Sequence, residues 1–480
     1  MKVVEEDGRP RPDERRFDAN KPSSRQTRFA ATLMRRGLHV RTRASVFQFN
    51  MKLFLILALI VLTAFHANAQ TAAIAVAKPV ESAAELRLES FNKVWNTVNE
   101  KHYDSTFGGV DWNKIRSAYE SKAIAAKTDN EFHGVLRQML GELKLSHFGI
   151  LPPAAEIAAA QSGRGVVGIE IKWIDGIPLI GRVETDSLAA AAGIKTGFIV
   201  SKIDGKTAAE LTKPLELSLA ARKVTDGMRK IYLERTIEGI INGTSGTAVK
   251  IELLDANDRR QIFNLIRQSF SGQMSQAMGN FPPQEVVFES RMLPDNIGYI
   301  RFNMWVIPQM PKLRAAIREF FPAIGIIIDL RGNPGGVGGM ASGVAGLMMD
   351  KQASLGSMKM RGGVNEFIVY PQSEPFAGKV VILTDHGSGS TSEVFAAGMQ
   401  ELGRATIVGT TTAGAVLPSV FEKLPTPALF QYAIADYRSP KNILIEGRGV
   451  IPDIESKQTR KSLLSGGDAQ LEAAVKSILK

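Results

Sequence analysis

Two glycine-rich loops carry the residues whose types and spacing could do chemistry. One is the run His386-Gly-Ser-Gly-Ser-Thr-Ser-Glu393, which places several hydroxyls where an apolar strand is expected to pass into a helix. A serine at such a junction would meet the helix dipole and free backbone N–H groups, and this favours a nucleophile. Serine-rich runs also cap helices and form turns, so the run alone leaves both interpretations open.

The second loop is Asp329-Leu-Arg-Gly-Asn-Pro-Gly-Gly336. Its glycines would let backbone N–H groups face an anionic atom at a helix amino end, which suits an oxyanion hole. A tight turn that needs glycine for backbone freedom explains the string equally well. A phosphate-binding loop is disfavoured because no Gly-Lys-Ser or Gly-Lys-Thr follows. Each loop follows an apolar strand of a predicted parallel sheet, and ligands bind at the carboxyl ends of the strands in such sheets. Two glycine-rich loops at these strand ends therefore strengthen the chemical interpretation.

A serine nucleophile needs a base, and the sequence offers few candidates. After residue 69 the histidines are His102, His133, His147 and His386. His147 follows Ser146 where a helical segment should end, whereas His102 and His133 lie on expected helices and are interpreted as structural. His386 remains a rival base, although it lies only four positions before Ser390.

The elements that must position these residues form three regions of a multidomain α/β chain. Residues 83–150 are expected to form a small helical domain, with apolar side chains at helical spacing and a capping-box pattern at Thr128–Glu131. Residues 290–460 alternate apolar strands (297–303, 324–330, 379–384, 405–409) with helices (337–350, 391–402). Continuous apolar strands are buried on both faces, so a largely parallel sheet is predicted. A C-terminal helix is expected at 465–480.

Residues 163–268 read as a compact β-rich module. In residues 192–205, small residues are followed by a glycine turn and then by a strand that ends in Ile-Asp-Gly. This pattern resembles a PDZ domain. The resemblance implies a groove that takes a peptide as an added strand, with N–H groups near Val167, Gly168 and Ile169 capturing its terminal carboxylate. An ordinary β-domain with turn glycines is the alternative.

The net charge of +11 does not indicate a nucleic-acid surface. Of 59 basic and 48 acidic residues, 13 and 6 lie in the first 69 positions, so the remainder is close to balanced. Residues 51–69 read as a secretory signal with a basic start, an apolar run and small residues at Ala67 and Ala69. A membrane anchor is the alternative, but the apolar run is short against the ~20 residues of a membrane span.

Cleavage after this signal would leave a periplasmic or secreted chain that starts at Gln70, with no stable membrane span. Residues 1–50 are polar and arginine-rich, and a start codon assigned too far upstream, or a disordered extension, explains them best. The chain has no cysteine, which excludes disulfides, thiolate metal sites and a cysteine nucleophile. No metal or organic cofactor is expected, because four scattered histidines offer little to build a zinc site.

Together these motifs resemble the tail-specific, or C-terminal-processing, serine peptidase family, and more closely its tricorn-core-like branch. The likeness covers roughly 83–460 and includes Leu145-Ser146-His147, the PDZ-like insert, both glycine-rich loops and Glu446-Gly-Arg-Gly-Val-Ile-Pro-Asp-Ile454. It implies a catalytic domain of the ClpP/crotonase-like type and polypeptide substrates. Many members use a Ser-Lys dyad, but the lysine position is Ala415 here.

The tricorn-like branch instead uses a Ser-His pair and a later glutamate. The resemblance therefore implies Ser390 as nucleophile, His147 as base, and Ser146 and Glu446 as orienting and polarising groups. It chooses Ser390 over Ser388 and Ser392 because the family nucleophile lies three residues before the glutamate that matches Glu393. It also implies an oxyanion hole from the N–H groups of Thr391 and of Gly335 or Gly336.

The function that follows is an exported serine endopeptidase that acts on unfolded or carboxy-terminal segments. The missing lysine keeps a second hypothesis open, in which the same scaffold is an inactive peptide- or ligand-binding protein. The sequence leaves the oligomeric state and the cleavage-site preference undetermined.

Overall fold

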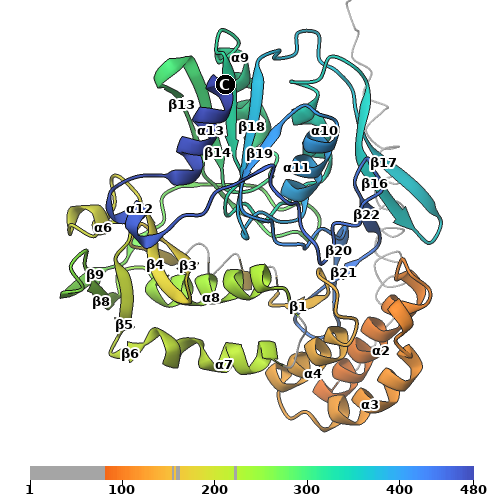
Figure 1. Ribbon diagram of the computed structural model, residues 1–480. Coiled ribbons are helices and arrows are strands. Elements are labelled where there is room, and N and C mark those ends of the chain that lie inside the picture. Colours follow the sequence, from red (N-terminus) through yellow and green to blue (C-terminus); the bar gives the residue numbers. More distant parts are fainter. Residues whose placement is uncertain (1–81, 154–155, 158–159, 161–162, 221–223) are drawn as a thin grey trace, which may run out of the picture. The chain divides into compact units, whose positions relative to one another are not determined.

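The computed structural model describes residues 82–153, 156–157, 160, 163–220 and 224–480 (Figure 1). The extension 1–50 and the expected signal at 51–69 lie outside these ranges. Among the described residues, no helix combines the length and the apolar character needed to span a membrane.

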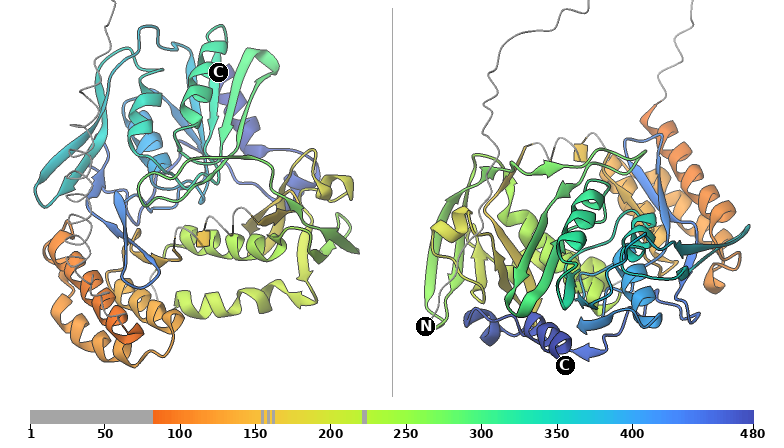
Figure 2. Two further views of the ribbon diagram at one scale, coloured as in Figure 1. Left: turned by 180° about the vertical axis from the view of Figure 1, so that it is seen from behind. Right: turned by 90° about the horizontal axis from the view of Figure 1, so that it is seen from above.

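Three helices open the described chain and pack side by side (Figure 2). Ser82 and Glu85 form a full capping box at the first. Thr128 caps the third by accepting a hydrogen bond from the Glu131 N–H, but the Glu131 carboxylate accepts one from the Lys127 N–H, so the expected capping box is only half formed. The helices are α2 (Ala83–Lys101), α3 (Trp112–Ala125) and α4 (Asp129–Gly141), with a 3-10 turn η1 (Phe107–Gly109) after α2.

A short strand joins this helical segment to the C-terminal half of the chain. β1 (Gly149–Leu151) pairs antiparallel with β21 (Leu429–Ala433), which pairs with β20 (Ser419–Lys423). Phe132 of α4 and Phe430 of β21 share one apolar core. The residues just before β1 are therefore positioned by a partner strand far along the sequence.

The module at 163–268 contains an antiparallel sheet in the order β3-β4-β5-β8-β9, in which β6 also pairs with β5. Two long helices, α7 (Ala208–Ala220) and α8 (Asp226–Ile241), lie within it, and the sequence did not predict them. The core face of α8 is rich in isoleucine, a residue typical of strands, and this hides its helical period. The remaining elements are β2 (Arg164–Val166), β3 (Ile169–Ile174), β4 (Ile177–Val183), α6 (Leu188–Ala191), β5 (Ile199–Ile203), β6 (Lys206–Thr207), β7 (Gly243–Thr244), β8 (Ala248–Leu254), β9 (Arg260–Ile266) and β10 (Gln268–Ser269).

The central sheet has the order β13-β14-β15-β18-β19-β23. The first pair is antiparallel and the other four pairs are parallel, so the expected largely parallel sheet is confirmed. Its strands are β13 (Phe288–Leu293), β14 (Ile297–Phe302), β15 (Gly325–Asp329), β18 (Lys379–Thr384), β19 (Thr406–Gly409) and β23 (Ile454–Glu455).

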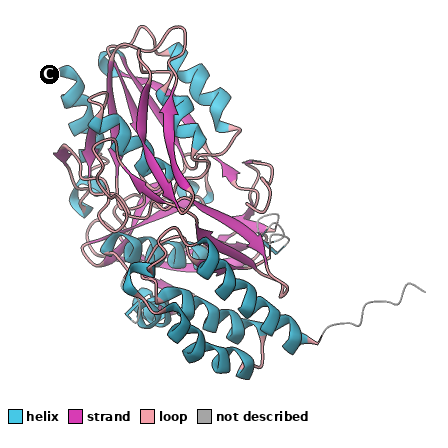
Figure 3. Cartoon of the chain, turned by 90° about the vertical axis from the view of Figure 1, so that its right-hand side faces the viewer, coloured by secondary structure: helices cyan, strands magenta, loops and turns pink. Residues whose placement is uncertain are grey.

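Helices cover both faces of this sheet (Figure 3). Ile326 and Ile328 of β15 pack in the core formed with α9 (Gln309–Glu319), α10 (Gly339–Ala345) and α11 (Thr391–Glu401). The residue between them, Ile327, packs on the opposite face against α13 (Ala469–Leu479). Successive side chains of a strand point to opposite faces, so burial on both sides accounts for the continuous apolar strands.

The remaining elements lie around this core. A long hairpin pairs with β22, and α12 precedes the expected C-terminal helix. Their bounds are β11 (Gln273–Met274), β12 (Glu285–Val286), η2 (Pro294–Asn296), β16 (Ala353–Met360), β17 (Gly363–Val369), β22 (Asp436–Arg438) and α12 (Arg460–Leu464).

Candidate active site

Ser390 is the N-cap residue of α11 and ends the loop that follows β18. Its backbone has φ 51° and ψ −118°, a conformation that L-residues rarely adopt, and the side chain is partly exposed. Such strained residues cluster at functional sites. By contrast, Ser388 and Ser392 are fully buried, and their hydroxyls donate to the carbonyls of Leu330 and Asn333. Ser390 is the only one of these three serines that a substrate can reach.

A buried carboxylate holds the Ser390 backbone in this conformation. Glu393 accepts hydrogen bonds from the Thr412 hydroxyl and from the N–H groups of Ser390, Gly414 and Ala415, at 2.5 to 3.1 Å. Burial raises the pKa of Glu393 to about 7, and these four donors favour the ionised form and oppose that rise. The sequence indicated Glu393 only as a landmark for the nucleophile, and the capping-box spacing was the one signal of its role.

The second glycine-rich loop lies against the serine. A Cβ built on Gly335, whose φ is 101°, would lie 2.6 Å from the Ser390 Cβ, so only glycine fits there. The Gly335 N–H already donates to the Asn333 side chain. Within the described ranges, the N–H groups of Gly336 and Thr391 have no hydrogen-bond acceptor, and the Thr391 hydroxyl donates to the Gly336 carbonyl at 2.9 Å.

Ser146, His147 and Glu446 form a hydrogen-bonded group. The Ser146 hydroxyl lies 2.7 Å from His147 Nδ1 and donates to the Glu446 carboxylate at 3.0 Å, while the Ser146 N–H also donates to Glu446. A hydroxyl has one proton, so Ser146 accepts from Nδ1–H and His147 keeps its proton on Nδ1. Nε2 is then the basic nitrogen. Burial lowers the pKa of His147 to about 4 and raises that of Glu446.

Residues 415 and 416 connect this group to Ser390. The Ala415 carbonyl accepts from the Ser390 N–H at 2.8 Å, and the next N–H, that of Val416, donates to Glu446 at 2.9 Å. In the part of the chain that is described, no hydrogen bond joins the Ser390 hydroxyl to His147. The structure thus brings Ser390, Ser146, His147 and Glu446 into one continuous network, with Ala415 between its two halves.

The other histidines have structural partners. His133 Nε2 contacts the buried Thr426 hydroxyl, and His102 stacks on Tyr103 and Phe148. His386 points to the module, where its Nε2 lies 2.8 Å from the Glu234 carboxylate of α8.

The predicted peptide-carboxylate site lines a cavity of about 470 Å³, which residues of the module and of the segment 270–303 enclose together. Gly168 has φ 82°, and a Cβ there would collide with Ser187. The carbonyls of Val167 and Gly168 are bonded to Ala189 and Glu184 N–H groups, which fixes the loop. Ile169 begins β3, an edge strand of the sheet.

The open edge of β3 already has acceptors of its own. The Ile171 N–H donates to Glu238 and the Trp173 N–H donates to Glu234, both at 2.7 Å. These carboxylates of α8 take the places that the carbonyls of an added strand would occupy. Burial raises the pKa of Glu238 to about 7.

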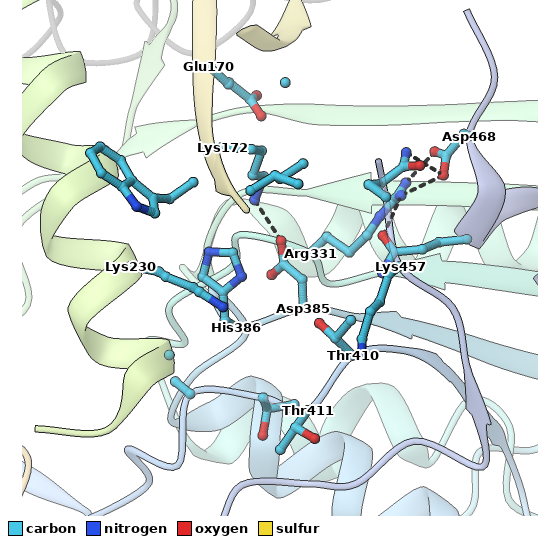
Figure 4. A pocket seen from close by; sticks show the side chains of 18 of the residues that line it. Glu170, Lys172, Lys230, Arg331, Asp385, His386, Thr410, Thr411, Lys457 and Asp468 are labelled. Atoms are coloured by element: carbon cyan, nitrogen blue, oxygen red, sulfur yellow. Dashed lines mark hydrogen bonds and ion pairs between the residues drawn. The ribbon is translucent and has the colours of Figure 1, made fainter. Parts of the chain in front are cut away.

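A larger cavity of about 710 Å³ lies between the module and the carboxyl ends of the central strands (Figure 4). Lys172 of β3 reaches Asp385 there, and Arg331 reaches Asp468. Ser390 and His147 do not line it. Sequence reasoning missed Lys172 and Asp385, since an isolated lysine in an amphipathic strand gives no signal of a distant partner.

Comparison with known proteins gives the class, that of the serine peptidases. Residues 296–456 match the family model of peptidase family S41, and residues 83–141 match that of the tricorn protease C1 domain. The chain is accordingly a serine peptidase with an S41 domain and a tricorn C1 domain, which confirms the family resemblance. Neither match covers 163–268, where the PDZ domain stays a prediction.

Individual relatives agree with this class. The chain is 25% identical over 396 residues to the carboxyl-terminal-processing protease of Synechocystis sp., covering 79% of this chain and 84% of the relative. It is 24% identical over 362 residues to the carboxy-terminal processing protease CtpA of Bacillus subtilis, covering 73% and 70%. The solved photosystem II D1 C-terminal processing protease shares the fold, with a TM-score of 0.54 and 20% identity over 82% of this chain and 97% of that one.

Proposed function

We propose that this chain is an exported endopeptidase that cleaves polypeptides near their carboxyl termini through an acyl-enzyme on Ser390. The observation that carries the proposal is the hydrogen-bond network that runs from Ser390 through residues 415–416 and Glu446 to Ser146 and His147. The processing activity of the relatives and the signal-like segment 51–69 support the substrate class and the export.

In the first half-reaction, the Ser390 hydroxyl oxygen attacks the scissile carbonyl carbon while His147 Nε2 takes the hydroxyl proton. The developing oxyanion accepts hydrogen bonds from the Gly336 and Thr391 N–H groups, whose lack of partners leaves them available. Collapse breaks the C–N bond, and His147 returns the proton to the leaving amine.

Deacylation repeats the proton transfers with water. His147 takes a proton from water, the hydroxide equivalent attacks the ester carbon, and the proton returns to Ser390 as the acid product leaves. The Glu446 carboxylate stabilises the transient imidazolium through Ser146, so its charge acts where positive charge develops. A lysine base has no part in this scheme, because the position that holds the lysine in other family members is Ala415 here.

Fluorophosphonate labelling of the chain from Gln70 tests the proposal without a known substrate, and cleavage of unfolded β-casein tests the reaction. We expect Ser390→Ala to abolish both activities and His147→Ala to reduce them by about 10²- to 10⁴-fold, the range for losing a general base. Ser465→Ala, at an exposed serine, should behave as wild type.

Full labelling of Ser390→Ala would exclude Ser390 as the nucleophile. A folded wild-type chain that neither reacts nor cleaves casein would exclude the peptidase mechanism and favour the binding-protein hypothesis.

A further inference from the structure

Asp385 lies between the two loops that form the candidate active site. It follows the last residue of β18 and is buried, with 6% of its surface exposed. Its Oδ1 accepts hydrogen bonds from the N–H groups of Gly332 and Gly387 at 2.8 and 2.9 Å. Gly332 lies in the glycine-rich loop 329–336 and Gly387 lies in the nucleophile loop 386–393, so one carboxylate oxygen holds the two loops together.

The two loops are in close contact at this point. A Cβ on Gly387 would lie 2.8 Å from the Gly332 Cα, and the Gly389 N–H donates to the Asn333 carbonyl at 3.0 Å. The N–H groups of Gly336 and Thr391 stand a few residues beyond these contacts. The distance between these two N–H groups therefore depends on how the two loops are aligned at the contacts near Gly332 and Gly387.

The second oxygen of Asp385 is held from another part of the chain. Lys172 Nζ of β3 lies 2.6 Å from Asp385 Oδ2, and Figure 4 shows the lysine reaching out of the strand toward it. Burial would lower the pKa of Lys172, but the carboxylates of Asp385 and Glu234 raise it. Lys172 and His386 lower the pKa of Asp385 against the effect of burial. Both residues are thus charged, and the charge of each offsets the cost of burying the other.

We propose that Lys172 and Asp385 are positioning residues, which set the register of the two loops and so the spacing of the oxyanion donors Gly336 and Thr391. The inference rests on the proposed function and adds a residue of the 163–268 module to the machinery. Neither side chain touches the reacting atoms in this scheme.

A merely structural ion pair would predict a different result. Loss of a structural pair lowers stability and leaves the reaction of the remaining folded molecules unchanged. Loss of a positioning pair lowers kcat and the labelling rate of the folded molecules, because misplaced oxyanion donors act on the transition state and not on substrate binding.

The test compares Lys172→Met, Lys172→Arg, Asp385→Asn and the control Arg460→Met. Arg460 of α12 also joins the module, through hydrogen bonds to the carbonyls of Gly197 and Asp255 and an ion pair with Asp258, but it contacts neither loop. For each variant, thermal unfolding, the second-order fluorophosphonate labelling rate, and KM and kcat on a casein-derived peptide are measured.

We expect Lys172→Met and Asp385→Asn to lower the labelling rate and kcat by roughly 10- to 100-fold with KM within about twofold, below the cost of deleting an oxyanion donor. Lys172→Arg should recover most of the rate, and Arg460→Met should keep the wild-type rate even if its melting temperature falls. Wild-type kcat in folded Lys172→Met, or no recovery by Lys172→Arg, would overturn the proposal. An unreactive wild-type chain would instead refute the proposed function itself.

Discussion

At the scale of single residues, the surroundings of His147 suit the role of base that we propose for it. Ser146 donates its proton to Glu446 and so fixes the imidazole proton on Nδ1. Burial lowers the pKa of the ring to about 4, so the ring is neutral and Nε2 is free to take a proton at every pH near neutrality. The resemblance implied that Ser146 and His147 act together, but the tautomer of His147 depends on Glu446, which lies 300 positions from Ser146.

The titration of His147 tests this environment. A histidine in the unfolded chain takes up its proton near pH 6.5, whereas His147 in the folded chain should do so near pH 4. Because the unfolded state binds more protons between these values, acidification below 6.5 should destabilise the fold through this residue. Histidine-selective ¹³C NMR measures the titration, with His147→Gln to assign the signal.

An imidazole signal of His147 that titrates near pH 6.5 would contradict the buried placement.

At the scale of elements, the strand β1 determines where the proposed base, His147, lies. β1 is three residues long and is held by β21, while α4 packs on the same core. Thr426, in the loop between β20 and β21, joins the helices to this sheet: its hydroxyl accepts from Ser90 and contacts His133 Nε2, and its N–H donates to Ser90. These contacts are buried, so they fix the position of the sheet that holds β1 relative to the helices.

Thr426→Val should therefore weaken the helical segment and slow the serine chemistry together. Removal of one buried hydroxyl leaves its partners unpaired and costs about 1–3 kcal/mol. We expect faster amide hydrogen exchange in α2 and α4, and slower fluorophosphonate labelling, with no change of exchange in α11. Thr459→Val, which removes an exposed helix cap at α12, is the control and should keep the labelling rate.

If Thr426→Val accelerates exchange in α2 and α4 but labels at the wild-type rate, the helical segment does not position the base.

The elements that the sequence predicted best are those with a local signal. The strands β14, β15, β18 and β19 are continuous apolar runs and lie where expected. The helices α7 and α8 were missed because they are stabilised by tertiary packing, α8 on β3 and α7 on α8 and β5. Lys172 was missed because its partner Asp385 is brought near only by the fold. Ser390 could be singled out only by resemblance, and its geometric reason is the burial of Ser388 and Ser392.

At the scale of the whole molecule, the module and the S41-matching region meet at the loop 386–393. Glu234 bonds both the Trp173 N–H on the edge of β3 and His386 in that loop. A peptide that adds to β3 must displace Glu234 and Glu238, so peptide binding competes with contacts of the chain itself.

Substrate preference tests whether the module presents carboxyl termini. We expect a peptide with an apolar end and a free carboxylate to be cleaved with a kcat/KM about 10- to 100-fold above its C-terminal amide, since hydrogen bonds to charged groups contribute about 1.5–3 kcal/mol. Gly168→Ala should remove this preference, because a Cβ there collides with Ser187 and distorts the loop.

Labelling of Ser390 by the small fluorophosphonate is the control and should persist in Gly168→Ala. Equal rates for acid and amide in the wild type would exclude carboxylate capture at Val167, Gly168 and Ile169.

The hydrogen bonds between Ser146 and Glu446 also bear on the biosynthesis of this peptidase. A ribosome releases the Ser390 loop well before residue 446, so the growing chain holds Ser146 and His147 without the Glu446 carboxylate that accepts from Ser146. A chain that stops short of Glu446 keeps that defect permanently. Under the proposed mechanism, activity therefore arises only when synthesis of the catalytic domain is nearly complete, which spares the nascent polypeptide from its own proteolysis.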